Sequence, residues 1–236
     1  MTNGNNNINT RKYLSVSIIL LVSFMIVAAI VSPKINNNPT GSFSLPSIIQ
    51  SDDASTFNQL NNSHYKPLDE LMILLSKYGR EVVWTIAGIL IFFFGGSTGR
   101  RAAIIMALAM LVLIPLGTIA KQVVGRPRPV IPQADFLMAA DTDYSYPSGH
   151  AVIVSAGAAV LLALFRNTHR KLAVSIGLTV EAALVCVSRV YVGGHYPLDV
   201  IGGILLGAGV AFIFVAAAST KRAEKLLQPV EKALKR

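Results

Sequence analysis

Residues 188–199 read Ser-Arg-Val-Tyr-Val-Gly-Gly-His-Tyr-Pro-Leu-Asp, and they end one strongly apolar segment and begin another. Pro197 is expected to open a helix, so that the Asp199 carboxylate, four residues after His195, can reach a ring nitrogen of the imidazole. An arginine that binds an anion and a histidine oriented by a carboxylate are the side chains needed for attack on a phosphorus centre. The alternative interpretation of this stretch alone is a charged turn between two helices, with a purely structural His195.

The composition of the chain is typical of a membrane protein. Of its 236 residues 53% are hydrophobic and 14% are charged, whereas a soluble domain carries about a quarter charged residues. The apolar residues come in runs close to the roughly 20 that cross a bilayer as a helix. The sequence therefore predicts an all-α fold, a polytopic membrane helical bundle. The single cysteine, Cys186, excludes a disulfide within the chain.

Six apolar runs are predicted to be transmembrane helices, at 13–32, 82–98, 102–120, 148–165, 172–189 and 198–218. An amphipathic helix lying in the membrane interface is predicted before the second span, at 67–78, because its apolar residues share one face. The first run is predicted to be a retained span, and the alternative is a signal peptide cleaved near residues 27–29.

The remaining segments divide the chain. Residues 1–12 are predicted to be a disordered cytoplasmic tail, 33–65 a polar extracytoplasmic linker, and 219–236 a basic cytoplasmic tail. They flank a membrane domain at 66–218 that holds the polar motifs.

The distribution of charge predicts the orientation of the chain in the membrane. With both termini in the cytoplasm, the inner segments hold thirteen of the 21 Lys and Arg residues, but only Glu224 and Glu231 among the acids. The positive-inside rule favours this orientation, and it explains the net charge of +9 without a nucleic-acid partner. Residues 121–147 and 189–199 should therefore emerge together on the extracytoplasmic side.

Two other segments on that side carry polar motifs at the predicted ends of spans. Residues 121–129 read Lys-Gln-Val-Val-Gly-Arg-Pro-Arg-Pro, and residues 147–150 read Pro-Ser-Gly-His. Together with 188–199 they resemble the signature of the lipid phosphate phosphatases, also called type 2 phosphatidic acid phosphatases. These form the membrane branch of a superfamily that includes the vanadium haloperoxidases. The signature is Lys-x6-Arg-Pro, Pro-Ser-Gly-His and Ser-Arg-x5-His-x3-Asp, which this chain matches in full, so residues 66–218 are predicted to be a phosphatase-like membrane domain.

The resemblance and the chemistry of the side chains imply the same roles. His195 is expected to attack phosphorus and form a phosphohistidine, with Asp199 fixing its tautomer. His150 is expected to protonate the leaving group and then to activate water. The phosphate is expected to be bound by cationic side chains and by the start of the fourth span, namely by Lys121, Arg128, Arg189, Ser148 and Gly149.

The function implied is a metal-independent phosphatase, without a cofactor, that acts on a lipid phosphate or lipid diphosphate at the outer interface of the plasma membrane. Polyprenyl diphosphate, phosphatidic acid-like and phosphatidylglycerophosphate-like lipids are the candidate substrates, and the expected partners are these substrates and membrane lipids. A phosphotransferase would use the same intermediate. The alternatives are a vanadate-dependent haloperoxidase and a non-catalytic membrane protein that binds or transports lipid. The sequence does not predict an oligomeric state.

Two charged residues fall outside the motifs. Arg126 is interpreted either as a residue facing the headgroup or a second phosphate, or as a solvated charge. Glu181 lies about two turns inside the fifth run, where an acid is a candidate functional residue. The preferred interpretation of Glu181 is a protonated carboxyl group that is hydrogen-bonded to a neighbouring helix.

Overall fold

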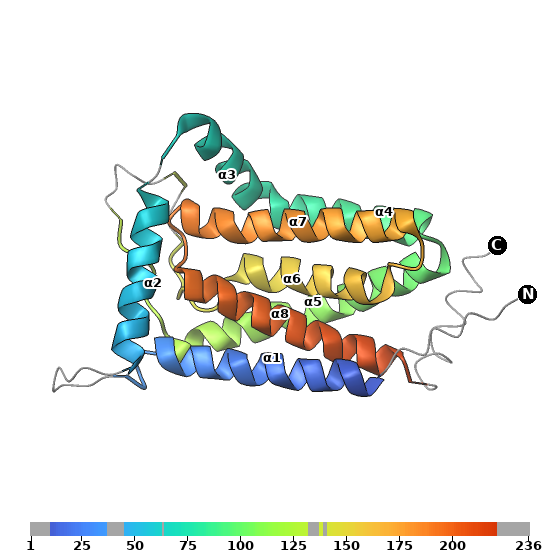
Figure 1. Ribbon diagram of the computed structural model, residues 1–236, viewed down its shortest axis with the longest axis horizontal. Helices are drawn as coiled ribbons and strands as arrows, with labels where there is room; N and C mark the ends of the chain where they lie inside the picture. The colour runs from blue at the N-terminus through green and yellow to red at the C-terminus, as the bar shows by residue number, and fades with distance from the viewer. Residues whose placement is uncertain (1–9, 37–44, 63, 132–136, 139–140, 221–236) are drawn as a thin grey trace, which may run out of the picture.

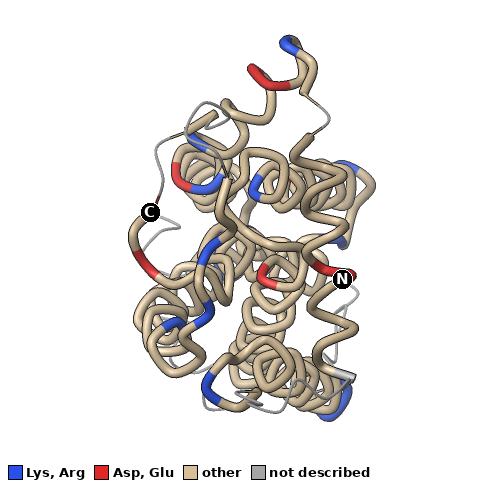
Figure 2. The backbone as a smooth tube through the Cα atoms, turned by 90° about the vertical axis from the view of Figure 1, so that its left-hand side faces the viewer, with Lys and Arg blue, Asp and Glu red and all other residues tan. Residues whose placement is uncertain are grey.

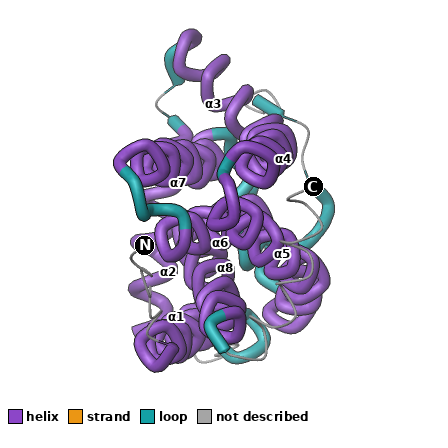
Figure 3. The backbone as a smooth tube through the Cα atoms, turned by 90° about the vertical axis from the view of Figure 1, so that its right-hand side faces the viewer, coloured by secondary structure: helices purple, strands orange, loops and turns teal. Residues whose placement is uncertain are grey.

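The computed structural model describes residues 10–36, 45–62, 64–131, 137–138 and 141–220. Within these ranges all regular elements are helical, and Figure 3 shows no strand among them. They are α1 (Thr10–Val31), α2 (Leu45–Asn61), α3 (Lys66–Tyr78), the π-helical turn η1 (Gly79–Val83), α4 (Trp84–Phe94), α5 (Gly96–Val124), α6 (Gly149–Leu164), α7 (His169–Tyr191) and α8 (Pro197–Ala218).

Six of these helices form a bundle. The helices α1, α4, α5, α6, α7 and α8 run along the long axis of the molecule, whereas α2 lies across one end of the bundle (Figure 1). The helix α3 rises from that same end and leads through η1 into α4. The first residues of α1 and the last residues of α8 lie at the opposite end.

The helical membrane fold expected from the sequence is confirmed, while the number of spans stays a prediction. Among the described residues, α1, α5, α7 and α8 are long and apolar enough to cross a membrane. The apolar helix α6 has 16 residues, and α4 has 11 residues. The predicted amphipathic helix at 67–78 corresponds to α3.

One local expectation was wrong. The break expected between the second and third spans, at 99–101, lies inside α5, because the chain breaks earlier, where Gly96 adopts a positive φ of 68°. The Arg101 side chain donates a hydrogen bond to the carbonyl oxygen of Ala218 at the end of α8. This bond gives a partner to a carbonyl group that the helix itself leaves unpaired. The expected linker at 33–65 also contains the 17-residue helix α2.

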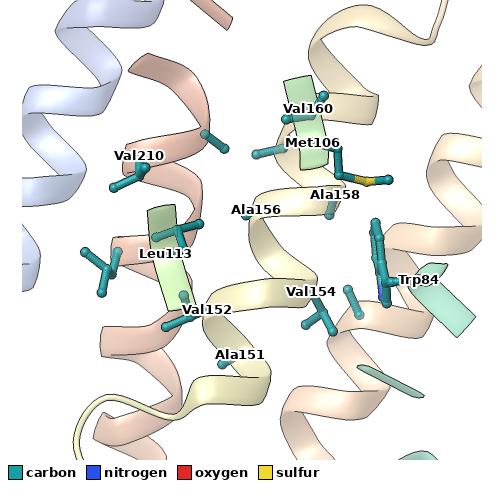
Figure 4. Packing of buried hydrophobic residues seen from close by; sticks show 14 of the residues in the cluster. Trp84, Met106, Leu113, Ala151, Val152, Val154, Ala156, Ala158, Val160 and Val210 are labelled. Carbon is teal, nitrogen blue, oxygen red and sulfur yellow. The ribbon is translucent and has the colours of Figure 1, made fainter. Parts of the chain in front are cut away.

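The helix α6 forms the centre of the bundle, because small residues allow its neighbours to approach closely. A side chain at Gly157 would collide with the ring of Trp84 from α4, which lies flat against α6 (Figure 4). On the other side, a Cβ at Gly203 would meet the carbonyl oxygen of Ser148, and one at Gly207 would meet that of Val152. Such close approach is the usual basis of helix association in lipid.

A Gly207→Ala substitution should destabilise the protein by about 1–3 kcal/mol, because the new methyl group meets backbone that cannot rotate away. The measurement is the unfolding midpoint in detergent. Gly177→Ala is the matched control, since a Cβ at Gly177 meets nothing within 4 Å. Equal midpoints for the two variants would contradict the close packing of α8 on α6.

Candidate active site

The three motif segments meet at the end of the bundle that α2 crosses. They are the segment after α5, the start of α6 and the turn between α7 and α8. Figure 2 views this end and shows basic and acidic residues close together over the helix ends. The sequence placed these segments on one side of the membrane, and the structure places them at one end of the molecule.

His195 lies at the centre of the site, in the turn before α8. The side chain is 1% exposed, and its Nδ1 is 3.5 Å from Oδ2 of Asp199 in the first turn of α8. That oxygen also accepts a hydrogen bond from the backbone N–H of Tyr196 at 2.9 Å, which fixes the carboxylate beside the ring. The 3.5 Å separation between Nδ1 and Oδ2 is longer than a normal hydrogen bond.

The imidazole of His195 is neutral at pH 7. Burial lowers its pKa to about 4, and the neighbouring guanidinium groups of Arg189 and Arg128 act in the same direction, while Asp199 opposes them. A neutral ring has a lone pair on one nitrogen, and a carboxylate beside Nδ1 favours a lone pair on Nε2. Nε2 is 3.3 Å from Nη1 of Arg128, so this nitrogen faces the cationic part of the site.

The start of α6 is joined to this centre through the backbone. The N–H of Ser148 donates to the carbonyl oxygen of Asp199 at 2.9 Å. The hydroxyl of Ser148 is fully buried and has no hydrogen-bond partner among the described residues, so it is available to an anion. Gly149 and His150 follow in the first turn of α6, where unpaired backbone N–H groups favour negative charge.

Three cations from different elements converge on two carboxylates. Asp143 binds Nζ of Lys121 at 2.6 Å and also pairs with Arg128. Asp141 binds Arg128 at 3.1 Å and Arg189 at 3.0 Å. The acids are half-exposed, whereas the cations are largely buried.

The two carboxylates therefore pair with the same three cations that the sequence predicts to bind phosphate. Partial burial raises the pKa of Asp143, but hydrogen bonds from Lys121 and Arg128 outweigh it and bring the pKa to about 2. The acid remains ionised at any moderate pH, so any anion that binds these cations would have to compete with it.

Arg126 is neither solvated nor facing a headgroup, which corrects both interpretations of this residue. The side chain is 7% exposed and lies between two carboxylates. It binds Oδ1 of Asp199 at 2.7 Å and Oδ2 of Asp53 at 2.5 Å, and its guanidinium stacks 4.2 Å from the centre of the Tyr196 ring. Asp53 also accepts the backbone N–H of Leu198 at 2.8 Å, which ties α2 to the start of α8.

The pKa of Asp53 is raised, and Arg126 limits the rise. Burial raises the pKa of the Asp53 carboxyl group, and the hydrogen bond and charge of Arg126 oppose this rise. Sequence reasoning did not select Asp53 because it lies in a polar segment without a motif. The only signal in the local sequence was an acidic residue for which no partner was evident.

Glu181 has the kind of partner that the sequence suggested. Its Oε2 accepts the indole N–H of Trp84 at 2.9 Å, which links α7 to α4. Its other oxygen is buried without a partner among the described residues.

An apolar cavity of about 820 Å³ opens from the site between α4, α5 and α6. Lys121, Asp143 and Gly149 line it at the charged end. Apolar side chains line the remainder, including Trp84, Ile89, Phe92, Phe93, Met106, Met110, Leu113 and Ile153. A charged headgroup and an apolar tail can therefore be bound side by side.

Comparison with known proteins identifies the family. A family model described as the PAP2 superfamily matches residues 101–223. The undecaprenyl-diphosphatase of Sulfolobus acidocaldarius is 41% identical over 174 residues, which are 73% of this chain and 81% of that protein. The chain belongs to the PAP2 superfamily. The resemblance drawn from the three motifs is confirmed.

Two further proteins are similar to this chain. Undecaprenyl-diphosphatase BcrC of Bacillus subtilis is 28% identical over 64% of this chain and 75% of its own length. The crystal structure of a transmembrane PAP2-type phosphatidylglycerolphosphate phosphatase from Bacillus subtilis matches with a TM-score of 0.64. It is 24% identical and covers 89% of this chain and 96% of that one, which supports the fold. The chain is accordingly an integral membrane protein.

Removing the two carboxylates that form ion pairs with the three cations should strengthen anion binding. In an Asp141→Asn/Asp143→Asn variant, inorganic phosphate should inhibit this PAP2 protein at about tenfold lower concentration, since fewer charge-assisted hydrogen bonds must be broken first. The measurement is the inhibition constant of phosphate. Asp52→Asn in α2 is the control, and unchanged or weaker inhibition in the double variant would contradict the competition.

Arg126→Gln should destabilise the fold by about 3–5 kcal/mol, because it leaves the Asp53 and Asp199 carboxylates buried without their shared cation. Adding Asp53→Asn to this variant should recover part of the loss by removing one of the two charges. The measurement is unfolding in detergent, with the exposed neighbour Asp52→Asn as control. A double variant less stable than Arg126→Gln alone would argue against a shared cation.

Proposed function

We propose that this PAP2 protein hydrolyses a lipid diphosphate of the polyprenyl type through a phosphohistidine on His195, without a metal ion. The chain is a lipid phosphate or diphosphate hydrolase, as its family and its undecaprenyl-diphosphatase relatives indicate. The observation that carries the mechanism is the convergence of three cations beside a buried neutral imidazole. The observation that favours a long-tailed lipid is the apolar cavity that opens from the same place.

In the first step, the terminal phosphate replaces Asp141 and Asp143 and is held by the three cations. Nε2 of His195 attacks phosphorus, and the P–N bond forms as the bond to the bridging oxygen breaks. His150 gives a proton to the departing oxygen. Positive charge develops on the attacking imidazole, and Asp199 stabilises it from the Nδ1 side.

In the second step, water replaces the departed lipid. His150, now without its proton, accepts a proton from water while the oxygen attacks phosphorus and the P–N bond breaks. Inorganic phosphate leaves, and both imidazoles return to their initial states. The cations and the buried Ser148 hydroxyl stabilise the equatorial oxygens in both steps.

The orientation proposed from the charge distribution is an extracytoplasmic site with both termini in the cytoplasm. In support, the site lies at one end of the bundle, and α1 begins and α8 ends at the other (Figure 1). Arg100, Arg101, Arg166 and Arg170 belong to segments that the positive-inside rule assigns to the cytoplasm.

The other two readings of the sequence have less support. A vanadate-dependent haloperoxidase would hold vanadate in the same cage of cations, yet the relatives described above are phosphatases. A non-catalytic lipid transporter would place polar residues near the middle of the bundle, whereas the cations here lie at helix ends.

Detergent-purified protein should release phosphate from a polyprenyl diphosphate in EDTA, and His195→Ala should reduce kcat at least about a thousandfold, since the nucleophile is lost. The measurement is phosphate release from a panel of lipid diphosphates and lipid monophosphates. His169→Ala is the matched control, because His169 begins α7 at the opposite end of the bundle.

Two outcomes would count against this mechanism. One is a requirement for a divalent cation that EDTA removes, and the other is full activity in His195→Ala. A substrate labelled at its terminal phosphate gives a further check, because the label should remain on the protein under alkaline quenching when His150→Ala slows the second step.

A further inference from the structure

The π-helical turn η1, at Gly79–Val83, places a cation that lies outside the family motifs. Such a turn inserts one extra residue into a helix and often occurs at functional sites. Gly79 is required at its start, since a Cβ there would collide with the Val185 side chain of α7. The turn carries Arg80, which lies in none of the three motif segments.

Arg80 faces the start of α6. Its Nη1 is 3.5 Å from Nδ1 of His150, and a Cβ built on Gly149 would lie 3.6 Å from the same Nη1. Arg80 also lines the apolar cavity at the end where Lys121 and Gly149 lie. The guanidinium is thus placed beside the histidine that serves the leaving group.

Arg80 belongs to a different charge cluster from the three motif cations. Lys121, Arg128 and Arg189 bind Asp141 and Asp143, whereas Arg80 pairs with its neighbour Glu81 through its Nε at 2.6 Å. Glu81 is half-exposed, so water or a ligand can replace Glu81 as the partner of Arg80. Arg80 is only partly buried and carries a planar fork of donors suited to phosphate.

We propose that Arg80 binds the second phosphate of a lipid diphosphate, the one that departs with the lipid. This inference rests on the proposed function and names the substrate class more closely. When Nε2 of His195 takes the terminal phosphoryl group, the electron pair of the broken P–O bond passes to the bridging oxygen. That oxygen receives the proton of His150, and the lipid monophosphate that leaves is an anion within reach of Arg80.

A lipid monophosphate makes no such contact, because its leaving group is an alcohol. Arg80 therefore favours diphosphates over monophosphates, while the three motif cations bind the transferred phosphoryl group of either substrate. The interaction with the leaving phosphate strengthens as the bridging bond breaks, so its loss should lower kcat as well as kcat/KM.

The test compares farnesyl diphosphate with farnesyl monophosphate, which share one tail, in the wild type, Arg80→Gln, Arg80→Lys and Lys77→Gln. The ratio of kcat/KM for diphosphate to monophosphate should fall about 10- to 100-fold in Arg80→Gln. The ratio should fall less in Arg80→Lys, because lysine keeps the positive charge but lacks the planar fork of N–H donors. Lys77→Gln, an exposed cation of α3 without a place in the cavity, should keep the ratio of the wild type.

The possible outcomes separate the two proposals. An unchanged ratio in Arg80→Gln, or an equal loss on both substrates, would overturn the role of Arg80 and leave the proposed phosphatase intact. Failure of the wild type to release phosphate from any lipid phosphate would overturn the proposed function itself. Unfolding midpoints in detergent show whether the Arg80 variants fold, and Arg80→Lys gives a second reading of the ratio if Arg80→Gln does not.

Discussion

The arrangement of the site depends on one buried cation. Arg126 lies between Asp53 and Asp199, and in a poorly polarisable interior each carboxylate is costly to bury without such a partner. The pairing has a geometric result, since it joins α2, the segment after α5 and the start of α8 at one point. Asp199 can then present its other oxygen to His195, so the orientation of this imidazole derives in part from a residue outside the motifs.

A second constraint comes from the close packing of α6 on α8. Without a Cβ at Gly203 the two backbones approach until the Ser148 and Asp199 main chains join by a hydrogen bond. The two motifs that carry His150 and His195 are thereby fixed relative to one another by backbone alone. A catalytic geometry set by backbone contacts tolerates little displacement, which suits a mechanism that needs two imidazoles around one phosphoryl group.

The structure brings the predicted motif segments together, whereas the residues that support them were not predicted from the sequence. The four-residue spacing of His195 and Asp199 could be interpreted from the sequence, because local helix geometry alone brings the two side chains together. Asp53 could not be predicted, because only the packing of α2 across the bundle brings it to Arg126, some seventy positions later. Arg126 itself was misread for the same reason, since a buried arginine and a solvated one look alike in a sequence.

Some helix boundaries could be predicted from the sequence and others could not. The ends of α6 and α8 were close to expectation, because the apolar run of α6 begins directly after Ser148 and Pro197 favours the first turn of α8 by its fixed φ. The third span was predicted to begin at residue 102, whereas α5 begins at Gly96, where a positive φ sets the break. The π-helical turn before α4 was also not predictable, because it is imposed by the fit of Gly79 against α7.

The cavity and the cations have different consequences for selectivity. In the proposed mechanism, an apolar tail in the cavity between α4, α5 and α6 would contact the protein equally before and during the reaction, so it would improve binding without accelerating the chemical step. The cations would contact oxygens whose charge changes as the phosphorus bonds rearrange, and these contacts would lower the barrier. Tails of different length should therefore alter KM more than kcat, whereas the number and placement of phosphates should alter kcat. A bundle of this kind can accept many lipids and still discriminate strongly between their headgroups.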